Sequence, residues 1–258
     1  MSSAIIQIKK LCVERDRKIL RNINWTIHQD QQWVILGANG SGKTSLLNTI
    51  TGYLVPTSGA IQVFDNEYGQ TNWQDIRKKI GLVSASLAQR IQPDETALFV
   101  VASGKKAIIN LWKSPSRKEL NHARKILRQI QCAHLEQCAW NILSQGERQR
   151  VLIGRALMAN FAILFLDEPC AGLDPVAREN FLKFIEKLLH KRQAPYLVFI
   201  THHIEEITKH FTHVLLLKNG SVLNQGKKQS MLTSKNLSSC FNKKLNVIHK
   251  NGHYQIRL

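Results

Sequence analysis

The sequence has few acidic residues and no long hydrophobic segment. Its 258 residues include 18 Asp and Glu against 36 Lys and Arg, which gives a formal net charge of +18. The longest uninterrupted apolar runs, Ala97–Ala102 and Phe161–Leu166, hold six residues each, whereas about 20 are needed to span a bilayer. We therefore expect no transmembrane helix and a basic surface that attracts phosphate-bearing partners, among which charge alone does not discriminate.

Cysteine pairs, a secretory leader and sequence repeats are also missing. The five cysteines form no CxxC pair and are odd in number, so they cannot all pair within one chain. The N-terminal segment lacks the pattern of a cleavable signal peptide, and the ten histidines show no ligand-like spacing with cysteine that would indicate a zinc site. We expect a cytosolic chain that reaches a membrane only through a partner.

Continuously apolar runs predict the buried strands of a mostly parallel sheet, because a strand covered on both faces has no polar side. The runs are Trp33–Leu36, Ala162–Leu166, Tyr196–Ile200 and Val214–Leu217. Helical patterns between them, such as Ala177–His190, supply the crossovers of an α/β fold. The alternation from Ile5 to Ile27 predicts half-buried antiparallel strands, and the strand phase of Trp25 and Trp33 predicts core positions.

The length predicts a single domain over residues 1–258 with two additions. From about Gln92 to Glu136 no comparable strand occurs, and polar helical patterns such as Arg117–Gln129 indicate an inserted helical subdomain at about residues 92–150. The dipeptides Asn219–Gly220 and Asn251–Gly252 are hairpin-turn signals with β-type flanks. They predict a small β appendage at about residues 221–258.

A phosphate-binding motif lies directly after the first buried strand and leads into the helical stretch Ser45–Ile50. The segment fits G-x-x-x-x-G-K-[ST], in which glycines let backbone N–H groups converge on phosphates and the helix N-terminus adds its positive end. Lys43 is predicted to reach the β- and γ-phosphates, and Thr44 to ligate Mg²⁺. The predicted nucleotide-binding residues are Gly37, Ala38, Asn39, Gly40, Ser41, Gly42, Lys43, Thr44 and Ser45.

Two carboxylates, Asp167 and Glu168, follow a second buried strand. The carboxyl end of such a strand in an open α/β sheet faces the ligand crevice. Asp167 is predicted to hold Mg²⁺ through its water shell, and Glu168 to orient or deprotonate a water near the γ-phosphate. Taken singly, each acid could instead be a helix cap or a surface loop residue.

These motifs, with three more in the expected order, resemble those of ABC-type ATPases over essentially the whole chain. Leu143–Glu147, which reads LSQGE, is similar to the family's LSGGQ signature, and Ala171–Asp174 to its D-loop. Thr201–His202 resembles the switch histidine, so the resemblance gives His202 a γ-phosphate role and leaves His203 as an ordinary surface or core residue. It implies ATP and Mg²⁺ as ligands, with Lys43, Glu168 and His202 as catalytic residues.

The signature segment by itself also fits a capping box, because Ser144 and Glu147 have the S-x-x-E spacing. On an inserted subdomain, its helix N-terminus cannot reach the phosphate loop of the same chain. The resemblance implies that two domains face head to tail and that Ser144, Gln145, Gly146 and Glu147 of each close on ATP held by the other. Because one copy is present, it implies a homodimer.

Two positions depart from the family pattern. Members commonly carry a Gln that touches Mg²⁺ and transmits closure to the membrane subunits, but the matching residue here is Ala85. Either the loop is longer and Gln89, four residues later, substitutes, or the protein couples differently and Ser84 or Ser86 fills the polar role. The aromatic residue that usually stacks on adenine is also missing. Either Arg15 stacks its guanidinium plane there, or the base is only weakly recognised.

The resemblance implies a cytoplasmic ATPase, peripheral on the inner face of the cell membrane, that powers transport through separate transmembrane permease subunits. Several stretches resemble the molybdate and iron-chelate importer group. The alternative is a soluble ABC-type ATPase acting on nucleic acid or the ribosome, which the +18 charge and Ala85 favour. The chain lacks the second ATPase domain or long coiled coils of such members, and its basic runs lack interleaved aromatics, so we expect no stably bound nucleic acid. A non-hydrolysing scaffold is disfavoured because every hydrolytic position is filled.

Overall fold

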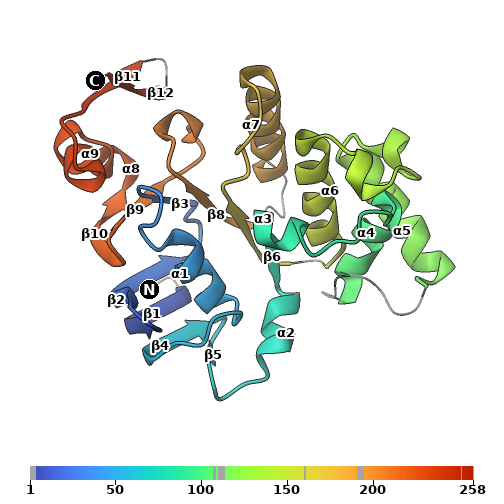
Figure 1. Cartoon of the computed structure of the whole chain (residues 1–258), viewed down its shortest axis with the longest axis horizontal. Helices are drawn as coiled ribbons and strands as arrows, with labels where there is room; N and C mark the ends of the chain where they lie inside the picture. The colour runs from blue at the N-terminus through green and yellow to red at the C-terminus, as the bar shows by residue number, and fades with distance from the viewer. Residues whose placement is uncertain are drawn as a thin grey trace. The chain divides into compact units, whose positions relative to one another are not determined.

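The N-terminal strands form an antiparallel sheet in the computed structural model, which describes residues 4–106, 109, 114–159, 161–190, 195–250 and 252–257. Strand β1 (Ala4–Glu14) lies between β2 (Lys18–His28) and β4 (Ser58–Val63), and β5 (Asn66–Glu67) completes the order β2-β1-β4-β5 (Figure 1). The predicted antiparallel strands are therefore confirmed, and each runs for 11 residues.

Backbone contacts divide the chain into two compact units. The first unit comprises residues 1–76 and 196–258, and the second comprises residues 77–195. Within the described residues, no helix combines the length and the apolarity that crossing a bilayer requires.

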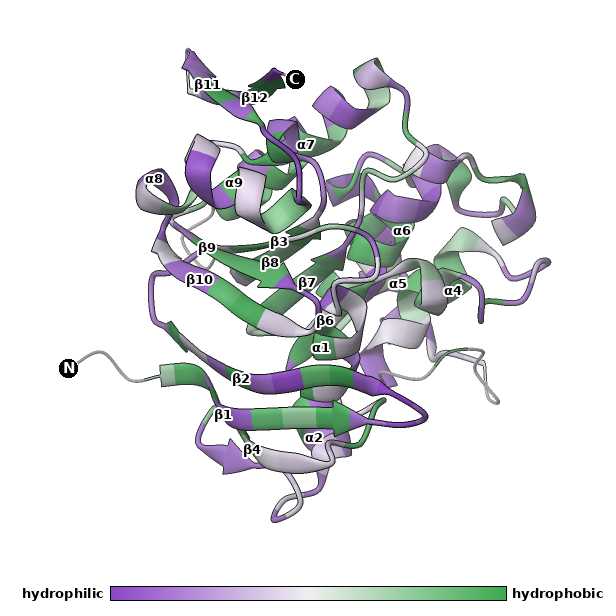
Figure 2. Ribbon diagram, turned by 60° about the vertical axis from the view of Figure 1, so that its left-hand side comes forward, coloured by the Kyte–Doolittle hydropathy of each residue, from purple (hydrophilic) through white to green (hydrophobic). Residues whose placement is uncertain are grey.

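The parallel strands of the first unit surround β3 (Trp33–Leu36), all four residues of which are buried. β3 runs parallel to both β8 (Tyr196–Thr201) and β9 (His213–Lys218). These three strands are largely hydrophobic (Figure 2), as strands covered on both faces must be. Helix α1 (Lys43–Ile50) follows β3, and the predicted α/β fold class is confirmed.

The C-terminal part of the first unit contains more helix than the hairpin signals predicted. Strand β10 (Ser221–Lys227) pairs antiparallel with β9 through the Asn219–Gly220 turn, as predicted. Two short helices, α8 (Lys228–Met231) and α9 (Ser234–Phe241), then precede the terminal hairpin of β11 (Asn246–Lys250) and β12 (His253–Arg257). The helices form because Met231, Leu237 and Cys240 are buried, which outweighs a local composition rich in Ser, Lys and Asn. Asn251, the first residue of the second hairpin signal, lies outside the described residues.

The second unit joins a parallel strand pair to a group of helices. Strand β6 (Ile80–Val83) pairs in parallel with β7 (Ile163–Asp167). The helices of this unit are α3 (Ala85–Ala88), α4 (Ala97–Ser103), α5 (Arg117–Gln129), α6 (Gln145–Met158) and α7 (Pro175–Leu189). Three short 3-10 turns accompany them, namely η1 (Gly104–Lys106), η2 (Ala133–Leu135) and η3 (Trp140–Ile142). Helix α2 (Trp73–Lys78) spans the boundary between the units in the sequence. Helices α4, α5 and α6 pack against one another. Helix α5 has the predicted bounds, Arg117–Gln129.

Candidate functional site

The predicted phosphate loop connects β3 to α1 in the first unit. Gly42 precedes the helix with a φ of 104°, in the left-handed region that glycine adopts without strain. Gly37 lies against the neighbouring strand β9, where a Cβ atom would come 2.3 Å from the carbonyl oxygen of Leu217. The loop therefore needs glycine at its first position for close packing and at its sixth for the turn into the helix.

Lys43 points back into the loop that precedes it. Its side chain is 5% exposed, and its Nζ donates hydrogen bonds to the carbonyl oxygens of Gly37 at 2.9 Å and Ala38 at 3.1 Å. The hydroxyl of Ser41 in the same loop is buried and has no hydrogen-bond partner within the described part of the chain. A buried hydroxyl of this kind fits a loop that receives phosphate oxygens.

The turn between β9 and β10 braces the phosphate loop from outside. Gly220, at a φ of 75°, donates its backbone N–H to the carbonyl of Ser41 at 2.9 Å and accepts one from the N–H of Arg21 at 2.7 Å. A Cβ atom on Gly220 would lie 2.2 Å from the carbonyl oxygen of Ile19. The sequence predicted this glycine only as a turn residue, since nothing local indicates its contact with the loop.

His202 lies next to the phosphate loop in the first unit. Thr201 pairs with Leu36 in the parallel register of β8 and β3, so His202 and Gly37 follow adjacent strand ends. The Thr201 hydroxyl donates to Glu206 Oε2 at 2.5 Å and accepts from the backbone N–H of His203 at 3.0 Å. The structure thus brings His202 and the loop to one end of the strands, while His203 is exposed.

Asp167 and Glu168 occupy different backbone conformations at the end of β7 in the second unit. Asp167 is the last residue of the strand and is 8% exposed. Glu168 has a φ of 49°, a left-handed conformation that costs a residue other than glycine about 1–3 kcal/mol. The turn is closed by a hydrogen bond from Ala171 N to the Glu168 carbonyl at 3.1 Å. Such strain is typical of functional positions, and it takes the backbone at Glu168 out of the extended conformation of the strand.

The segment after β6 resolves where the candidate substitutes for the missing Gln lie. Val83 pairs with Leu166, so Ser84 follows its strand at the same end as Asp167. The Ser84 hydroxyl caps α3 by accepting from Leu87 N at 3.2 Å, and it lies 3.0 Å from the Ser86 hydroxyl. Ala85 begins α3, whereas Gln89 caps its far end. Ser84 thus lies at the same strand end as Asp167, and Gln89 lies at the far end of α3.

The predicted signature segment begins α6 in the second unit with a complete capping box. Ser144 donates its backbone N–H and its hydroxyl to Glu147 Oε2 at 2.8 and 2.7 Å, and it accepts from Glu147 N at 3.4 Å. Burial raises the pKa of the Glu147 carboxyl, but the hydrogen bonds from Ser144 outweigh it and hold this pKa below its ordinary value. The helix N-terminus therefore carries an anion of its own.

The predicted D-loop packs on the first turn of α6. Leu173 Cδ2 lies 3.7 Å from the position of a Cβ built on Gly146, and Gln145 Cγ lies 3.7 Å from one built on Gly172. Asp174 then caps α7, because its Oδ1 accepts from the N–H of Val176 at 2.8 Å and of Ala177 at 2.9 Å. The second unit thus joins the signature and the D-loop, a contact that the sequence did not predict.

The candidate adenine contact is anchored to the backbone. The Arg15 guanidinium donates to the carbonyl oxygens of Glu14 at 3.0 Å and Val55 at 3.1 Å, which orients its plane. Trp25 and Trp33 are buried and pack edge to face with ring centroids 5.4 Å apart, so their predicted place in the core is confirmed.

No group of three or more His, Cys, Asp and Glu in the described part of the chain could hold a metal ion by itself. A cation next to the phosphate loop would therefore need ligands from bound phosphate groups as well as from the protein. Such sharing is usual for Mg²⁺, which keeps waters and few protein ligands.

Known proteins match the chain over most of its length. Residues 20–171 match the family model described as ABC transporter. The uncharacterized ABC transporter ATP-binding protein YlmA of Bacillus subtilis is 41% identical over 246 residues, which cover 95% of this chain and 93% of the relative. The probable iron chelatin transport ATP-binding protein of Helicobacter pylori is 31% identical over 251 residues and 95% of each chain.

Solved structures share the architecture. A bacterial ABC transporter cassette whose structure is dimeric has a TM-score of 0.74 and 26% sequence identity, and the match covers 86% of this chain and 98% of that one. The predicted P-loop core is thereby confirmed.

Proposed function

Because the chain belongs to the ABC transporter family of ATP-binding proteins, we propose that it is the ATP-hydrolysing subunit of a transporter, working as a homodimer. The observation that carries the proposal is the first unit's arrangement of Lys43, the phosphate loop and His202 at adjacent strand ends. We place one ABC-type domain over residues 1–258, with a helical subdomain at about 92–150 and a C-terminal appendage at about 221–258. Transmembrane permease subunits would hold it at the inner face of the membrane.

The phosphate loop would bind the triphosphate of ATP. Its converging N–H groups and the N-terminus of α1 favour negative charge. Lys43 would exchange its bonds to the loop carbonyls for bonds to the β- and γ-phosphates, and Ser41 would gain the partner that its buried hydroxyl lacks. Bound Mg²⁺ would neutralise charge that develops on the phosphates. Thr44 and Asp167 are the residues we assign to it, since a hydroxyl and a carboxylate are oxygen ligands of the kind it prefers.

Hydrolysis would need an oriented water. We assign Glu168 to hold the water and to accept its proton, and His202 to donate a hydrogen bond toward the γ-phosphate. Ser144, Gln145, Gly146 and Glu147 of one protomer would contact ATP on the other. The head-to-tail homodimer is supported by the dimeric structure of the related cassette and by the single signature in this chain.

Substitution of Glu168 tests the assignment. Glu168→Gln should lower ATP turnover by about 100-fold or more, as loss of a general base does. Because the bound ATP is then not hydrolysed, the variant should accumulate as an ATP-bound dimer. Lys43→Ala should instead lose ATP binding. Glu205→Gln, which neutralises an exposed acid in η4 (Ile204–Glu206) of the first unit, is the matched control and should leave turnover unchanged. Turnover measured by phosphate release and mass measured by light scattering separate these outcomes, and undiminished turnover in Glu168→Gln refutes the assignment.

Co-purification from detergent-solubilised membranes tests the transport role. Polytopic partners should accompany the tagged protein. Recovery of RNA without a membrane partner would favour the nucleic-acid alternative, for which the net charge of +18 is the supporting observation.

A further inference from the structure

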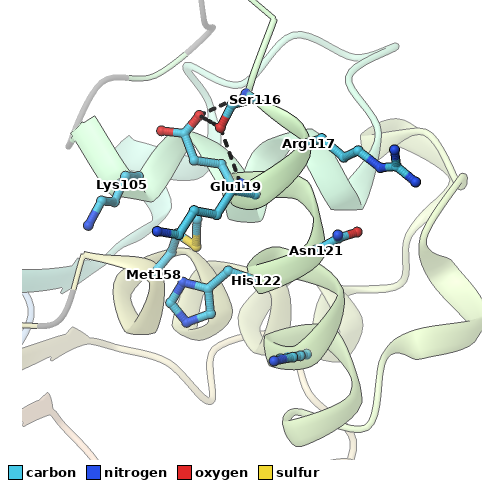
Figure 3. A pocket seen from close by; sticks show the side chains of 9 residues that line it. Lys105, Ser116, Arg117, Glu119, Asn121, His122 and Met158 are labelled. Carbon is cyan, nitrogen blue, oxygen red and sulfur yellow. Dashed lines mark hydrogen bonds between the residues drawn. The ribbon is translucent and has the colours of Figure 1, made fainter.

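A basic cavity of about 770 Å³ lies in the second unit at the start of α5, and none of its lining residues belongs to a motif assigned above. We call it the α5 pocket. Its lining comes from η1, from the first turns of α5 and from the end of α6 (Figure 3). The lining residues are Lys105, Ser116, Arg117, Lys118, Glu119, Asn121, His122, Lys125 and Met158.

Positive charge dominates this lining. Four of the nine residues are Lys or Arg and one is His, against a single acid, Glu119. Glu119 is engaged locally, because its Oε2 accepts from both the backbone N–H and the hydroxyl of Ser116 at 2.8 Å. These hydrogen bonds, with a smaller contribution from Lys106 and Lys105, hold the pKa of Glu119 below its ordinary value. The one carboxylate therefore stays ionised, and it offsets only part of the positive charge of the four basic side chains.

The cations lie on connected surfaces. Lys118, His122 and Lys125 are spaced i, i+4 and i+7, so they share one face of α5. Figure 3 shows His122 and Lys105 on the same side of α5 as Met158, with Arg117 and Asn121 on the other side. Met158 is buried and gives the cavity an apolar floor.

The wall that carries Lys105 is tightly packed on α6. A Cβ atom on Gly104 would lie 1.8 Å from the carbonyl oxygen of Arg155, so η1 contacts the backbone of α6 directly. The buried Arg155 side chain also donates from Nε to Ser103 Oγ at 3.0 Å. The backbone at Lys105 is thereby fixed relative to α6, while the Lys105 side chain is exposed and can reach a ligand.

Two cations outside the pocket in this unit form close ion pairs. Arg124 Nε, on the same helix, lies 2.7 Å from Glu136, and Lys183 Nζ lies 2.6 Å from Glu179. Within the described residues, Lys105, Lys118 and Lys125 form no ion pair. Four cations with one carboxylate among them leave a net positive charge, and an anion that bridges the cations reduces their mutual repulsion.

We propose that the α5 pocket binds a compact anion that carries at least one phosphate group, either free in solution or as the headgroup of an anionic lipid. The volume lies in the range of small-molecule sites. Several Lys and Arg side chains on a concave surface suit clustered phosphate oxygens. A concave site of this size favours a compact ligand over an extended polymer. The proposal is independent of ATP hydrolysis and of the residues assigned to it.

Binding should be measured in full-length protein that carries Lys43→Ala, so that the phosphate loop does not contribute. The probes are inorganic tripolyphosphate, vesicles of phosphatidylglycerol, and neutral vesicles of phosphatidylcholine. Lys118→Gln/Lys125→Gln removes two pocket charges. Arg128→Gln/Lys187→Gln, the matched control, removes two exposed charges from α5 and α7 that do not line the pocket. Thermal unfolding checks that each variant folds. If the Gln variant does not fold, Lys118→Arg/Lys125→Arg tests the pocket with its charge retained.

We expect tripolyphosphate or phosphatidylglycerol to bind at least about tenfold more weakly to the Gln pocket variant, with less than about threefold change in the control. Binding of tripolyphosphate identifies a soluble ligand, and binding of phosphatidylglycerol vesicles alone identifies a lipid headgroup. The Arg variant should bind like the parent. Three outcomes would overturn the proposal. They are an equal loss of affinity in the two Gln variants, no binding of either tripolyphosphate or phosphatidylglycerol, and pocket-dependent binding of single-stranded RNA in place of these two probes. ATP turnover by protein with intact Lys43 reports separately on the proposed function.

Discussion

The hydroxyl of Thr201 links the buried Glu206 carboxylate to the segment that carries His202. Thr201→Val removes this hydroxyl while keeping the shape of the side chain. Thr201 is 1% exposed and Glu206 is 2% exposed. Valine fills the same volume, is equally β-branched and suits a strand. On burial of apolar surface alone, the substitution should therefore be neutral or stabilising.

Hydrogen bonding predicts the opposite. The bond donated to the Glu206 carboxylate is worth about 1.5–3 kcal/mol, and the bond accepted from His203 N about 1 kcal/mol. Thr201→Val should then lower the free energy of unfolding by about 2–4 kcal/mol. For a chain of this length, that corresponds to a fall of about 5–15 °C in Tm.

Thr201→Ser is the control because it keeps the hydroxyl and loses one buried methyl group, at a cost of about 1 kcal/mol. Thermal unfolding followed by circular dichroism should rank the stabilities as parent, then Ser, then Val. ATP turnover should follow the same order if the hydroxyl also positions His202. A Val variant as stable as the Ser variant would refute the reasoning, because the hydroxyl would then contribute no more than a methyl group.

Three other substitutions or treatments test the second unit and the buried thiols. Gly104→Ala should destabilise the protein by about 3 kcal/mol in urea unfolding, because the new methyl group would lie 1.8 Å from a backbone carbonyl of α6; a change below about 1 kcal/mol contradicts the tight contact. Glu147→Gln should preserve the helix cap and strengthen ATP-driven dimerisation severalfold in sedimentation experiments. The reason is that it removes a negative charge hydrogen-bonded to Ser144, where a phosphate of ATP is proposed to bind. Weaker dimerisation would count against the binding of phosphate at this helix N-terminus. Burial raises the pKa of Cys132 and Cys240 to about 11, so about one such thiol in a thousand is ionised at pH 8. Peptide mapping should therefore find both cysteines almost unalkylated by iodoacetamide at pH 8 and increasingly modified as the pH approaches 11. Rapid reaction of both at pH 8 would show that they are accessible.

Elements whose signals are local were predictable from the sequence. Helix α5 has its predicted bounds because Ser116 and Glu119 form a capping box at its start and its apolar residues recur at helical spacing. The strands β3, β8 and β9 were visible as continuous apolar runs. The phosphate loop was also local, since eight consecutive residues carry the whole motif.

Features that depend on distant contacts were not predictable. Helix α9 consists largely of Ser, Lys and Asn, and it forms because Leu237 and Cys240 are buried in the folded unit. The position of Ser84 also needed the structure, because only the register of β6 on β7 shows that it lies at the end where Asp167 lies. The left-handed conformation of Glu168 has no sequence signal, since it is a glutamate where glycine would be expected.

The contact between Gly220 and Ser41 determines how far the chain can be shortened. Protein ending at Lys218 would retain every side chain assigned to ATP chemistry, but it would lose the backbone atoms that clasp the outside of the phosphate loop. We therefore expect the smallest functional cassette to extend at least one hairpin beyond its last recognisable motif, so truncations meant to isolate the ATPase should be placed after β10.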